Sequence, residues 1–328
     1  MRAAVYAGRG GTEVVQLVDR PQPEPGPDDL LVRVAAAGLN RADVLERAGR
    51  YGPAPPSTEA VVPGLEYAGT VVAAGANVRG IATGDRVFGL VAGGAHAEYV
   101  AVPAGTASLV PTELELTAAA AIPEAFITAD DALFARGAFG LGQTVVVHAV
   151  GSSVGLAAVG LAKLAGGVVI GTSRSPDKLA RAAAHGMMHG IALDDAFPKR
   201  VRELTGGRGA DVVLDFVGPA IFDRNVAALA LGGRIVQIGT LGGAAGTVSF
   251  GGLMARRGSL IGTVLKPRPL DEKIALARNF SARLVPLFAR GELRATVDRV
   301  FPLDEIADAH RYMEADQNFG KIILAIES

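Results

Sequence analysis

The chain has 328 residues, an apolar fraction of 49% and a formal net charge of −1, so it is long enough for two domains that each bury a core. Basic and acidic residues are interspersed, and we therefore expect no nucleic-acid partner and no binding to an anionic membrane. The absence of cysteine excludes disulfides, thiolate metal sites and a cysteine nucleophile. The apolar runs are too short to span a bilayer and the N-terminus carries no secretory signal, so we expect a cytoplasmic protein.

Short β-rich runs separated by glycine, proline and asparagine fill the first part of the chain, up to about residue 120. They are residues 30–35, 69–73, 85–90 and 97–102. This texture predicts an irregular β domain or a partial barrel. The proline-rich stretch 21–27 is interpreted as a stiff surface connection.

From about residue 117, alanine-rich helical sequence alternates with β-branched runs. The runs are residues 145–147, 168–170, 212–214, 234–238 and 260–264. Such alternation predicts an α/β fold with a parallel, doubly wound sheet. Near the C-terminus the pattern predicts a helix around 275–289, a strand near 297–300, a helix near 303–314 and a final strand at 321–326.

Residues 144–178 form the most informative unit, a predicted strand, helix and second strand joined by a turn of small residues at 149–153. Gly151, Ser152 and Ser153 would let the backbone approach a pyrophosphate, and a helix starting near Ser153 would point its free N–H groups at that anion. The glycine pattern is incomplete, because Gly155 fits the third glycine of G-x-G-x-x-G while Val150 and Ser152 replace the first two. By that pattern alone, an ordinary α/β turn is an equal alternative.

The residues after the second strand indicate the cofactor. An NAD-binding chain usually has an acidic residue there for the adenosine ribose, whereas this chain has Ser173, Arg174 and Lys178. Arginine and lysine donate charge-assisted hydrogen bonds to a 2′-phosphate, so the sequence predicts NADPH.

Several histidines and loops could also be functional, and for the histidines a structural role is the favoured interpretation. His148 closes an apolar strand and is interpreted as a packed, hydrogen-bonded histidine. His185 and His189 have helical spacing, but Gly186 between them disfavours a metal site. The strand-end loops at 216–218 and 238–240 lie where ligands bind in doubly wound sheets, and simple loop formation is an equal alternative for them. The glycine-rich run 241–246 is interpreted as a flexible crossover.

Three motifs, together with the dinucleotide unit, carry a family resemblance over nearly the whole chain. They are residues 30–78, 122–134 and 310–324. With these motifs the chain resembles the zinc-free quinone oxidoreductase branch of the medium-chain dehydrogenase/reductase superfamily. The resemblance implies a GroES-like domain built from residues 1–120 and 266–328 around a Rossmann domain at 121–265 that binds NADPH.

The resemblance also implies the site. Zinc-dependent relatives have a ligand histidine in a G-H-E motif, whereas this chain has Gly64, Leu65 and Glu66, so no metal is expected and Glu66 is left a structural role. Asn40, Asp43 and Tyr51 would lie by the substrate cleft, with Tyr51 as a hydrogen-bond or proton donor or, alternatively, as a wall of the pocket. The implied cofactor contacts are Val154, Ser173, Arg174, Lys178, Phe216, Ile238, Gly239, Thr240, Leu241, Val264, Leu265, Lys266 and Asn318.

The implied activity is zinc-independent hydride transfer from NADPH to a quinone or a similarly activated carbonyl. One alternative is a 2-enoyl or enone double-bond reductase. Another, of a different class, is an NADPH-binding structural or regulatory protein with little turnover. The family usually dimerises, and the run 260–264 is expected to be an edge strand that pairs with its twofold mate. Leu45 and Leu193 replace tyrosines found in some relatives, and these differences bear on the identity of the substrate more than on the choice of cofactor.

Overall fold

The computed structural model describes residues 1–51 and 61–326. Residues 52–60, which belong to the first family motif, and residues 327–328 lie outside the described part. The chain divides into two compact units. Unit 1 comprises Met1–Ile127 and Lys266–Ser328, and unit 2 comprises Thr128–Leu265. Each unit is described by itself.

Unit 2 contains a six-stranded sheet in which every pair of neighbouring strands is parallel. Its strands are β8 (Thr144–Val147), β9 (Val168–Ser173), β10 (His189–Ala192), β11 (Ala210–Asp215), β12 (Leu229–Gln237) and β13 (Ser259–Gly262). In the order β10-β9-β8-β11-β12-β13, the chain moves outward from β8 to β10, then crosses to β11 and moves outward on the other side to β13. This change in strand order between β8 and β11 is the Rossmann arrangement. The predicted doubly wound parallel sheet is therefore confirmed.

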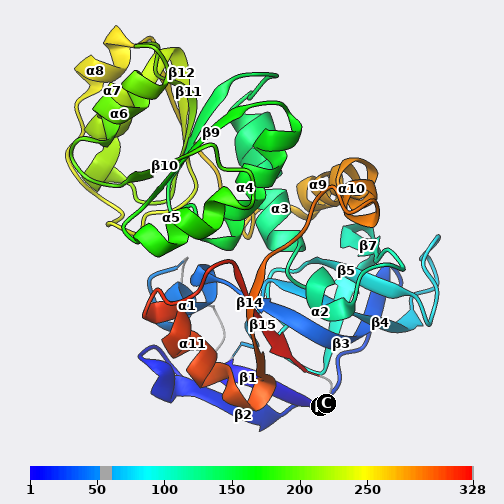
Figure 1. Cartoon of the computed structure of the whole chain (residues 1–328). Coiled ribbons are helices and arrows are strands. Elements are labelled where there is room, and N and C mark those ends of the chain that lie inside the picture. The colour runs from blue at the N-terminus through cyan, green and yellow to red at the C-terminus, as the bar shows by residue number, and fades with distance from the viewer. Residues whose placement is uncertain (52–60, 327–328) are drawn as a thin grey trace. The chain divides into compact units, whose positions relative to one another are not determined.

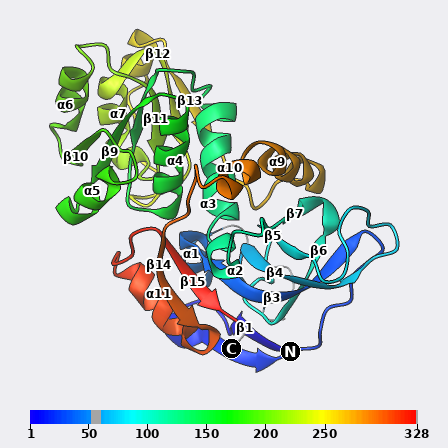
Figure 2. The same cartoon turned by 45° about the vertical axis from the view of Figure 1, so that its right-hand side comes forward.

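Helices cover both faces of this sheet (Figures 1 and 2). Helices α4 (Ser153–Leu164) and α5 (Pro176–Ala183) lie on one face, and α6 (Phe197–Leu204) and α7 (Phe222–Ala228) lie on the other. Unit 2 also contains α8 (Phe250–Ala255), a π-helical turn η3 (Asp131–Arg136) and a short 3-10 turn η4 (Pro219–Ile221). β-Branched residues such as Val146, Ile170 and Val213 are fully buried between the layers, as strands covered on both faces require.

Unit 1 is rich in β structure and is built from both chain ends. Its seven-stranded sheet contains β3 (Asp29–Leu39), β4 (Glu66–Ala74), β5 (Arg86–Leu90), β6 (Tyr99–Pro103), β7 (Ala107–Leu109), β14 (Val297–Pro302) and β15 (Lys321–Ala325). β1 (Arg2–Tyr6) pairs with β2 (Val15–Asp19). The central strand β3 is antiparallel to β4, β6 and β15, so the C-terminal strand is part of the N-terminal β domain.

Short helices complete unit 1. They are η1 (Thr12–Val14), α1 (Arg41–Arg47), η2 (Ala104–Thr106), α2 (Leu116–Ala119), α9 (Leu270–Arg283), α10 (Val285–Ala289), η5 (Leu303–Glu305) and α11 (Ile306–Glu314). The boundary between the units falls within α3 (Pro123–Asp130). Within the described ranges, no helix has the length and apolar character needed to cross a bilayer.

Two predicted elements differ from the observed ones. The single helix expected at 275–289 is broken at Leu284, because Pro286 lies in the first turn of α10 and has no N–H to continue a helix. The strand expected at 260–264 ends at Gly262, although β13 does form the edge of the sheet as predicted.

Candidate functional site

The turn between β8 and α4 in unit 2 is built for close backbone packing. A Cβ atom on Gly155 would lie 2.8 Å from the carbonyl oxygens of Ala149 and Val150, so only glycine lets the helix approach the turn this closely. Val150 stands in the place of the motif's first glycine. It is accommodated because Gly171 on β9 leaves room, since a Cβ there would lie 2.8 Å from a Val150 methyl group. The incomplete glycine pattern is therefore compensated by a glycine on the next strand.

The N-terminus of α4 has the properties of an anion site. The Ser152 hydroxyl oxygen accepts a hydrogen bond from the Gly155 amide at 3.0 Å and caps the helix. The amides of Ser153 and Val154 occupy the first helical positions, which precede the first intrahelical bonds and carry the positive end of the helix dipole. These residues, with Gly151 in the turn, fit a pyrophosphate.

The predicted cofactor-selecting residues lie at and just after the carboxyl end of β9. Ser173 ends the strand, Arg174 is exposed, and Lys178 lies in the first turn of α5. The hydroxyl oxygen of Ser173 accepts a hydrogen bond from the Ser175 amide at 3.0 Å, which fixes the start of this turn. The local geometry thus places one hydroxyl and two cations within six residues, a donor set that fits a 2′-phosphate.

The loops after β11 and β12 are joined. The amides of Leu241 and Gly242 donate to the carbonyl oxygens of Phe216 and Val217 at 2.9 and 2.8 Å. The run interpreted as a flexible crossover is therefore anchored where it begins. The predicted contacts Ile238, Gly239 and Thr240 fall in the segment between β12 and this anchor. Val264 and Leu265 follow β13 at the end of unit 2.

Unit 1 contains a buried group of charged and polar side chains, which we call the polar cluster: Asn40, Glu66, Glu124 and Lys321. Strand register brings three of them together, because β3 pairs with both β4 and β15, Asn40 follows the end of β3, and Glu66 and Lys321 begin the other two strands. The side chains of Glu66 and Lys321 are 0% and 1% exposed.

Glu66 is the centre of the polar cluster. Its Oε1 accepts hydrogen bonds from Lys321 Nζ at 2.5 Å and from Asn40 Nδ2 at 2.9 Å, and its Oε2 accepts from the Glu124 amide at 2.8 Å. Lys321 Nζ also donates to Asn40 Oδ1 at 2.6 Å. Burial alone would lower the pKa of Lys321, but the carboxylates of Glu66 and Glu124 outweigh burial and raise that pKa. Glu66 was expected to have a structural role, and in the structure its carboxylate is bound by the ammonium group of Lys321.

Asp43 lies one helical turn after Asn40 and is wholly buried. Its Oδ2 accepts a hydrogen bond from the Asn40 amide at 2.7 Å, so the carboxyl group caps the start of α1. Burial raises the pKa of Asp43 to about 7, against the lowering effect of that hydrogen bond. The carboxyl group can therefore carry or release a proton near neutral pH.

Tyr51 lies beside an ion pair. Lys266 Nζ donates to Glu46 Oε1 at 2.6 Å and lies 5.7 Å from the centroid of the Tyr51 ring. Burial, followed by the negative charges of Glu124, Asp43 and Glu46, raises the pKa of Tyr51 to about 12. The phenol therefore stays protonated at neutral pH and can act as a hydrogen-bond donor.

The structure thus gathers Asn40, Asp43, Tyr51 and Lys266 in unit 1, while the expected phosphate and adenosine contacts gather in unit 2. Asn318, also in unit 1, donates to the Gly320 carbonyl at 3.0 Å, next to the start of β15. Sequence reasoning missed Lys321 as a member of the cluster. The sequence offered one indication, because Lys321 is a single charged residue between Gly320 and the apolar run 322–326.

The residues at the Glu66 position do not fit a zinc ion. Leu65 is buried and cannot ligate a metal, and the sequence has no cysteine. Across residues 1–51 and 61–326, no group of three histidine, aspartate or glutamate side chains could hold a metal ion. The two histidines with helical spacing do not share a helix, because α5 ends at Ala183 and His189 begins β10.

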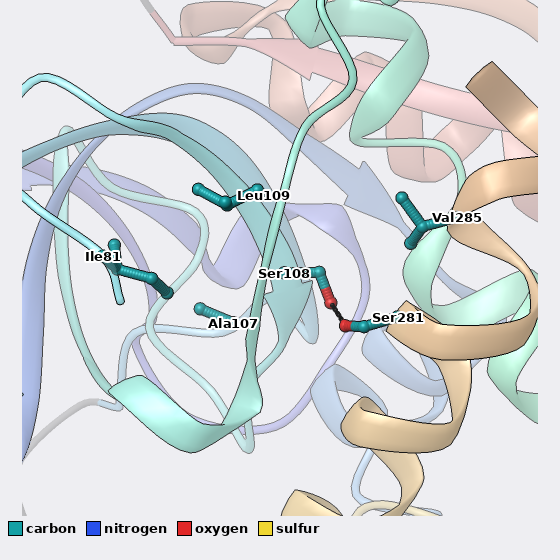
Figure 3. A pocket seen from close by; sticks show the side chains of 6 residues that line it. All are labelled: Ile81, Ala107, Ser108, Leu109, Ser281 and Val285. Carbon is teal, nitrogen blue, oxygen red and sulfur yellow. Dashed lines mark hydrogen bonds between the residues drawn. The ribbon is translucent and has the colours of Figure 1, made fainter. Parts of the chain in front are cut away.

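A pocket of about 290 Å³ in unit 1 is made by other residues (Figure 3). They are Ile81, Ala107, Ser108, Leu109, Ser281 and Val285. The hydroxyl groups of Ser108 and Ser281 share a hydrogen bond at 2.6 Å, and the rest of the wall is apolar. No titratable side chain lines this pocket, so it offers no group for acid–base chemistry.

Two family models match the chain. Residues 26–112 match the model described as alcohol dehydrogenase GroES-like domain, and residues 153–280 match the model described as zinc-binding dehydrogenase. The GroES-like fold expected for the β-rich unit is therefore confirmed.

Among the curated relatives that match almost end to end are a bacterial and a human protein. The chain is 32% identical to a quinone oxidoreductase of Pseudomonas aeruginosa, over 97% of this chain and 98% of the relative. It is 31% identical to the human synaptic vesicle membrane protein VAT-1 homolog, over 99% of this chain and 86% of that protein.

Three solved structures share the fold. An NAD-dependent alcohol dehydrogenase is 35% identical with a TM-score of 0.89 and full coverage of both chains. A mycobacterial protein complexed with NADPH is 31% identical with a TM-score of 0.90, over 99% of this chain and 100% of the other. The CurK enoyl reductase is 26% identical with a TM-score of 0.89, over 99% of each chain.

Proposed function

Because the chain belongs to the medium-chain dehydrogenase/reductase superfamily, in its quinone oxidoreductase branch, we propose that it is an NADPH-dependent, zinc-independent reductase of quinones or similarly activated carbonyl compounds. The oxidoreductase class follows from the family. The cofactor, the acceptor and the independence from zinc are the proposal.

The polar cluster of unit 1 is the observation that carries the proposal. In this chain the Glu66 carboxylate is bound by an ammonium ion, an amide and a backbone N–H, and the neighbouring residue is Leu65. A carbonyl substrate must then be activated by a hydrogen-bond donor instead of a Lewis acid. The Tyr51 phenol, which stays protonated at neutral pH, would be this donor.

We assign the cofactor NADPH, and it would supply the hydride when bound. Gly151, Ser152, Ser153 and Val154 would hold the pyrophosphate at the N-terminus of α4. Ser173, Arg174 and Lys178 would hold the 2′-phosphate at the end of β9. The further cofactor contacts implied by the family resemblance would be made by Phe216, Ile238, Gly239, Thr240, Leu241, Val264, Leu265, Lys266 and Asn318.

Tyr51 would donate a hydrogen bond to the substrate oxygen as that oxygen gains negative charge. Lys266 would keep the phenol in place through its contact with the ring, and Glu46 in turn holds Lys266. Asp43 and Asn40 would support the phenol indirectly, by fixing the start of α1, which carries Glu46. A positioned donor of this kind contributes about 10²–10⁴-fold in rate.

Two other functions have support of their own. The likeness to the CurK enoyl reductase favours enone double-bond reduction, for which the same phenol could bind the carbonyl oxygen. The VAT-1 homolog is a relative whose name states no enzymatic activity, and this likeness keeps the alternative of an NADPH-binding protein with little turnover.

One experiment separates these candidates. NADPH and NADH are titrated against the protein, and a panel of para-quinones and enones is then added to the preferred dinucleotide. Tighter binding of NADPH and faster quinone reduction are the expected results. Equal affinity for NADH would contradict the assignment of Ser173, Arg174 and Lys178. Faster enone reduction would favour the enoyl reductase, and tight binding without turnover would favour the slow binding protein.

We also propose a cytoplasmic homodimer. The edge strand β13 has unpaired backbone groups on one side and exposes 44% of Leu260, so it could pair with β13 of a second copy about a twofold axis. Sedimentation at micromolar concentration tests this part, and a monomer would contradict it.

A further inference from the structure

Four buried polar residues of unit 2 form one continuous chain of hydrogen bonds, which we call the buried relay: Thr172, His148, Asn225 and Asp215. All four are 0% exposed. His148 follows β8, Thr172 lies in β9, Asp215 ends β11 and Asn225 lies in α7. The relay therefore runs along the carboxyl edge of three neighbouring strands, where ligands bind in sheets of this type.

Each residue of the relay donates a hydrogen bond to the next, in the order Thr172, His148, Asn225 and Asp215. Asn225 Nδ2 donates to Asp215 Oδ2 at 2.9 Å, so the amide oxygen of Asn225 faces His148 Nε2 at 2.7 Å and accepts a hydrogen bond from its N–H. A flipped amide would set its oxygen against the Asp215 carboxylate. His148 Nδ1, 2.7 Å from Thr172 Oγ1, then accepts from the threonine hydroxyl. In the neutral imidazole, these bonds place the proton on Nε2.

At one end the relay binds backbone of the candidate dinucleotide site through a side chain, and at the other end the relay residue does so through its own main chain. Asp215 Oδ1 accepts hydrogen bonds from the amides of Val217 and Gly218 at 2.6 and 3.0 Å. The Thr172 carbonyl oxygen accepts from the Val150 amide at 3.1 Å, in the turn before α4. Thr172 also precedes Ser173 directly.

The loop held by Asp215 is itself bound to the loop after β12. The carbonyl oxygens of Phe216 and Val217 accept from the amides of Leu241 and Gly242. The Asp215 carbonyl oxygen accepts from the Ile238 amide at 2.8 Å. The relay is thus connected to the phosphate turn, to the end of β9 and to the two loops on the other side of the site.

We propose that the buried relay positions the loops that hold the dinucleotide, with Thr172, His148, Asn225 and Asp215 as positioning residues that do not touch it. The proposal rests on the dinucleotide binding proposed above. A fully satisfied buried network has one low-energy arrangement, since each broken bond leaves an unpaired polar group in the interior. Because the side chains favour this one arrangement, the backbone groups at the two ends of the relay are held in one position. Burial lowers the pKa of His148, which keeps the imidazole neutral and the direction fixed.

The tautomer is tested without any ligand. The nitrogen NMR spectrum of the protein with labelled histidine is compared with that of His148→Gln, which identifies the His148 signals. We expect one protonated nitrogen, Nε2, and one unprotonated nitrogen, Nδ1. A proton on Nδ1 would overturn the assigned direction of the relay.

The positioning role is tested with Thr172→Val, which keeps the shape of the side chain and removes the hydroxyl donor. Ile170→Val is the matched control, because Ile170 is fully buried two residues earlier on the same strand and takes no part in the relay. We expect Thr172→Val to weaken the binding of NADPH and NADH together by about three- to tenfold. Ile170→Val should leave both dissociation constants within about twofold, whatever its effect on the melting temperature. Unchanged affinities in Thr172→Val would overturn the proposal and leave the relay a purely structural feature.

Amide exchange in the ligand-free protein separates this proposal from the proposed function. Asn225→Leu removes the bond to Asp215, and we expect the amides of Val217 and Gly218 to exchange about tenfold faster. Unchanged exchange would overturn the positioning role. If the wild-type protein bound neither dinucleotide, the proposed function would be wrong. The exchange rates, which are measured without ligand, would still test whether the relay holds the loop in place.

Discussion

Replacing Lys321 by methionine should destabilise unit 1 by about 3–5 kcal/mol. At an effective dielectric constant of about 20, opposite charges 2.5 Å apart attract by about 6–7 kcal/mol, and the cost of burying them offsets part of this. Methionine keeps the length of the side chain but removes the cation from the buried Glu66 carboxyl group and from Glu124, whose Oε2 lies 3.5 Å from the ammonium nitrogen in the wild type. An uncompensated buried charge is the dominant cost.

The assay is urea unfolding followed by tyrosine fluorescence. The chain has no tryptophan, and its five tyrosines, at positions 6, 51, 67, 99 and 312, all belong to unit 1, so the signal reports that unit. Arg290→Met is the control, because Arg290 pairs with Glu292 at the same 2.5 Å distance but at the surface of the same unit. That exposed pair should contribute less than about 1 kcal/mol.

A double variant tests the cause of the loss. Lys321→Met combined with Glu66→Gln removes both charges of the pair, so we expect it to recover at least about half of the lost stability. The reasoning fails if Lys321→Met costs no more than the Arg290 control. It also fails if the double variant is less stable than Lys321→Met alone, because the loss would then not arise from an unpaired carboxylate.

Two further predictions concern the cofactor and pH. Lys178→Ala should weaken NADPH binding about tenfold and leave NADH binding unchanged, and an equal loss for both in a fluorescence titration would indicate a folding defect instead. Burial lowers the pKa of His310 to about 3, while the unfolded chain takes up this proton near pH 6.5, so its contribution to stability is complete above pH 6.5 and is lost as the pH falls toward 3. Between pH 6 and pH 5, His310→Phe should therefore lose about 1 kcal/mol less stability than the wild type in urea unfolding, and parallel curves would contradict this.

The sheet of unit 2 could be predicted because its strands are short, continuous β-branched runs between turn residues. The sequence could not predict that the phosphate turn has room for Val150. This room depends on Gly171, which lies 21 positions further on and becomes a neighbour only when β8 and β9 pair. The break before α10 was available in the sequence as Pro286, and the helical period of the flanking residues concealed it.

The polar cluster was beyond sequence reasoning for a different reason. Asn40 and Lys321 are separated by 281 positions, and their contact depends on the register between β3 and β15. Pattern analysis assigns a strand to each segment but gives no register between distant strands. The relay of unit 2 is a similar case, since His148 was correctly predicted to be packed and hydrogen-bonded, but its two partners lie on β9 and α7.

The initial rate of NADPH oxidation by a para-quinone, measured before and after dialysis against a strong metal chelator, tests the central claim most directly. The proposed reaction uses the phenol of Tyr51 to activate the carbonyl, so the rate should be unchanged by chelation and by added zinc. A rate that vanished on chelation and returned with zinc would contradict the account.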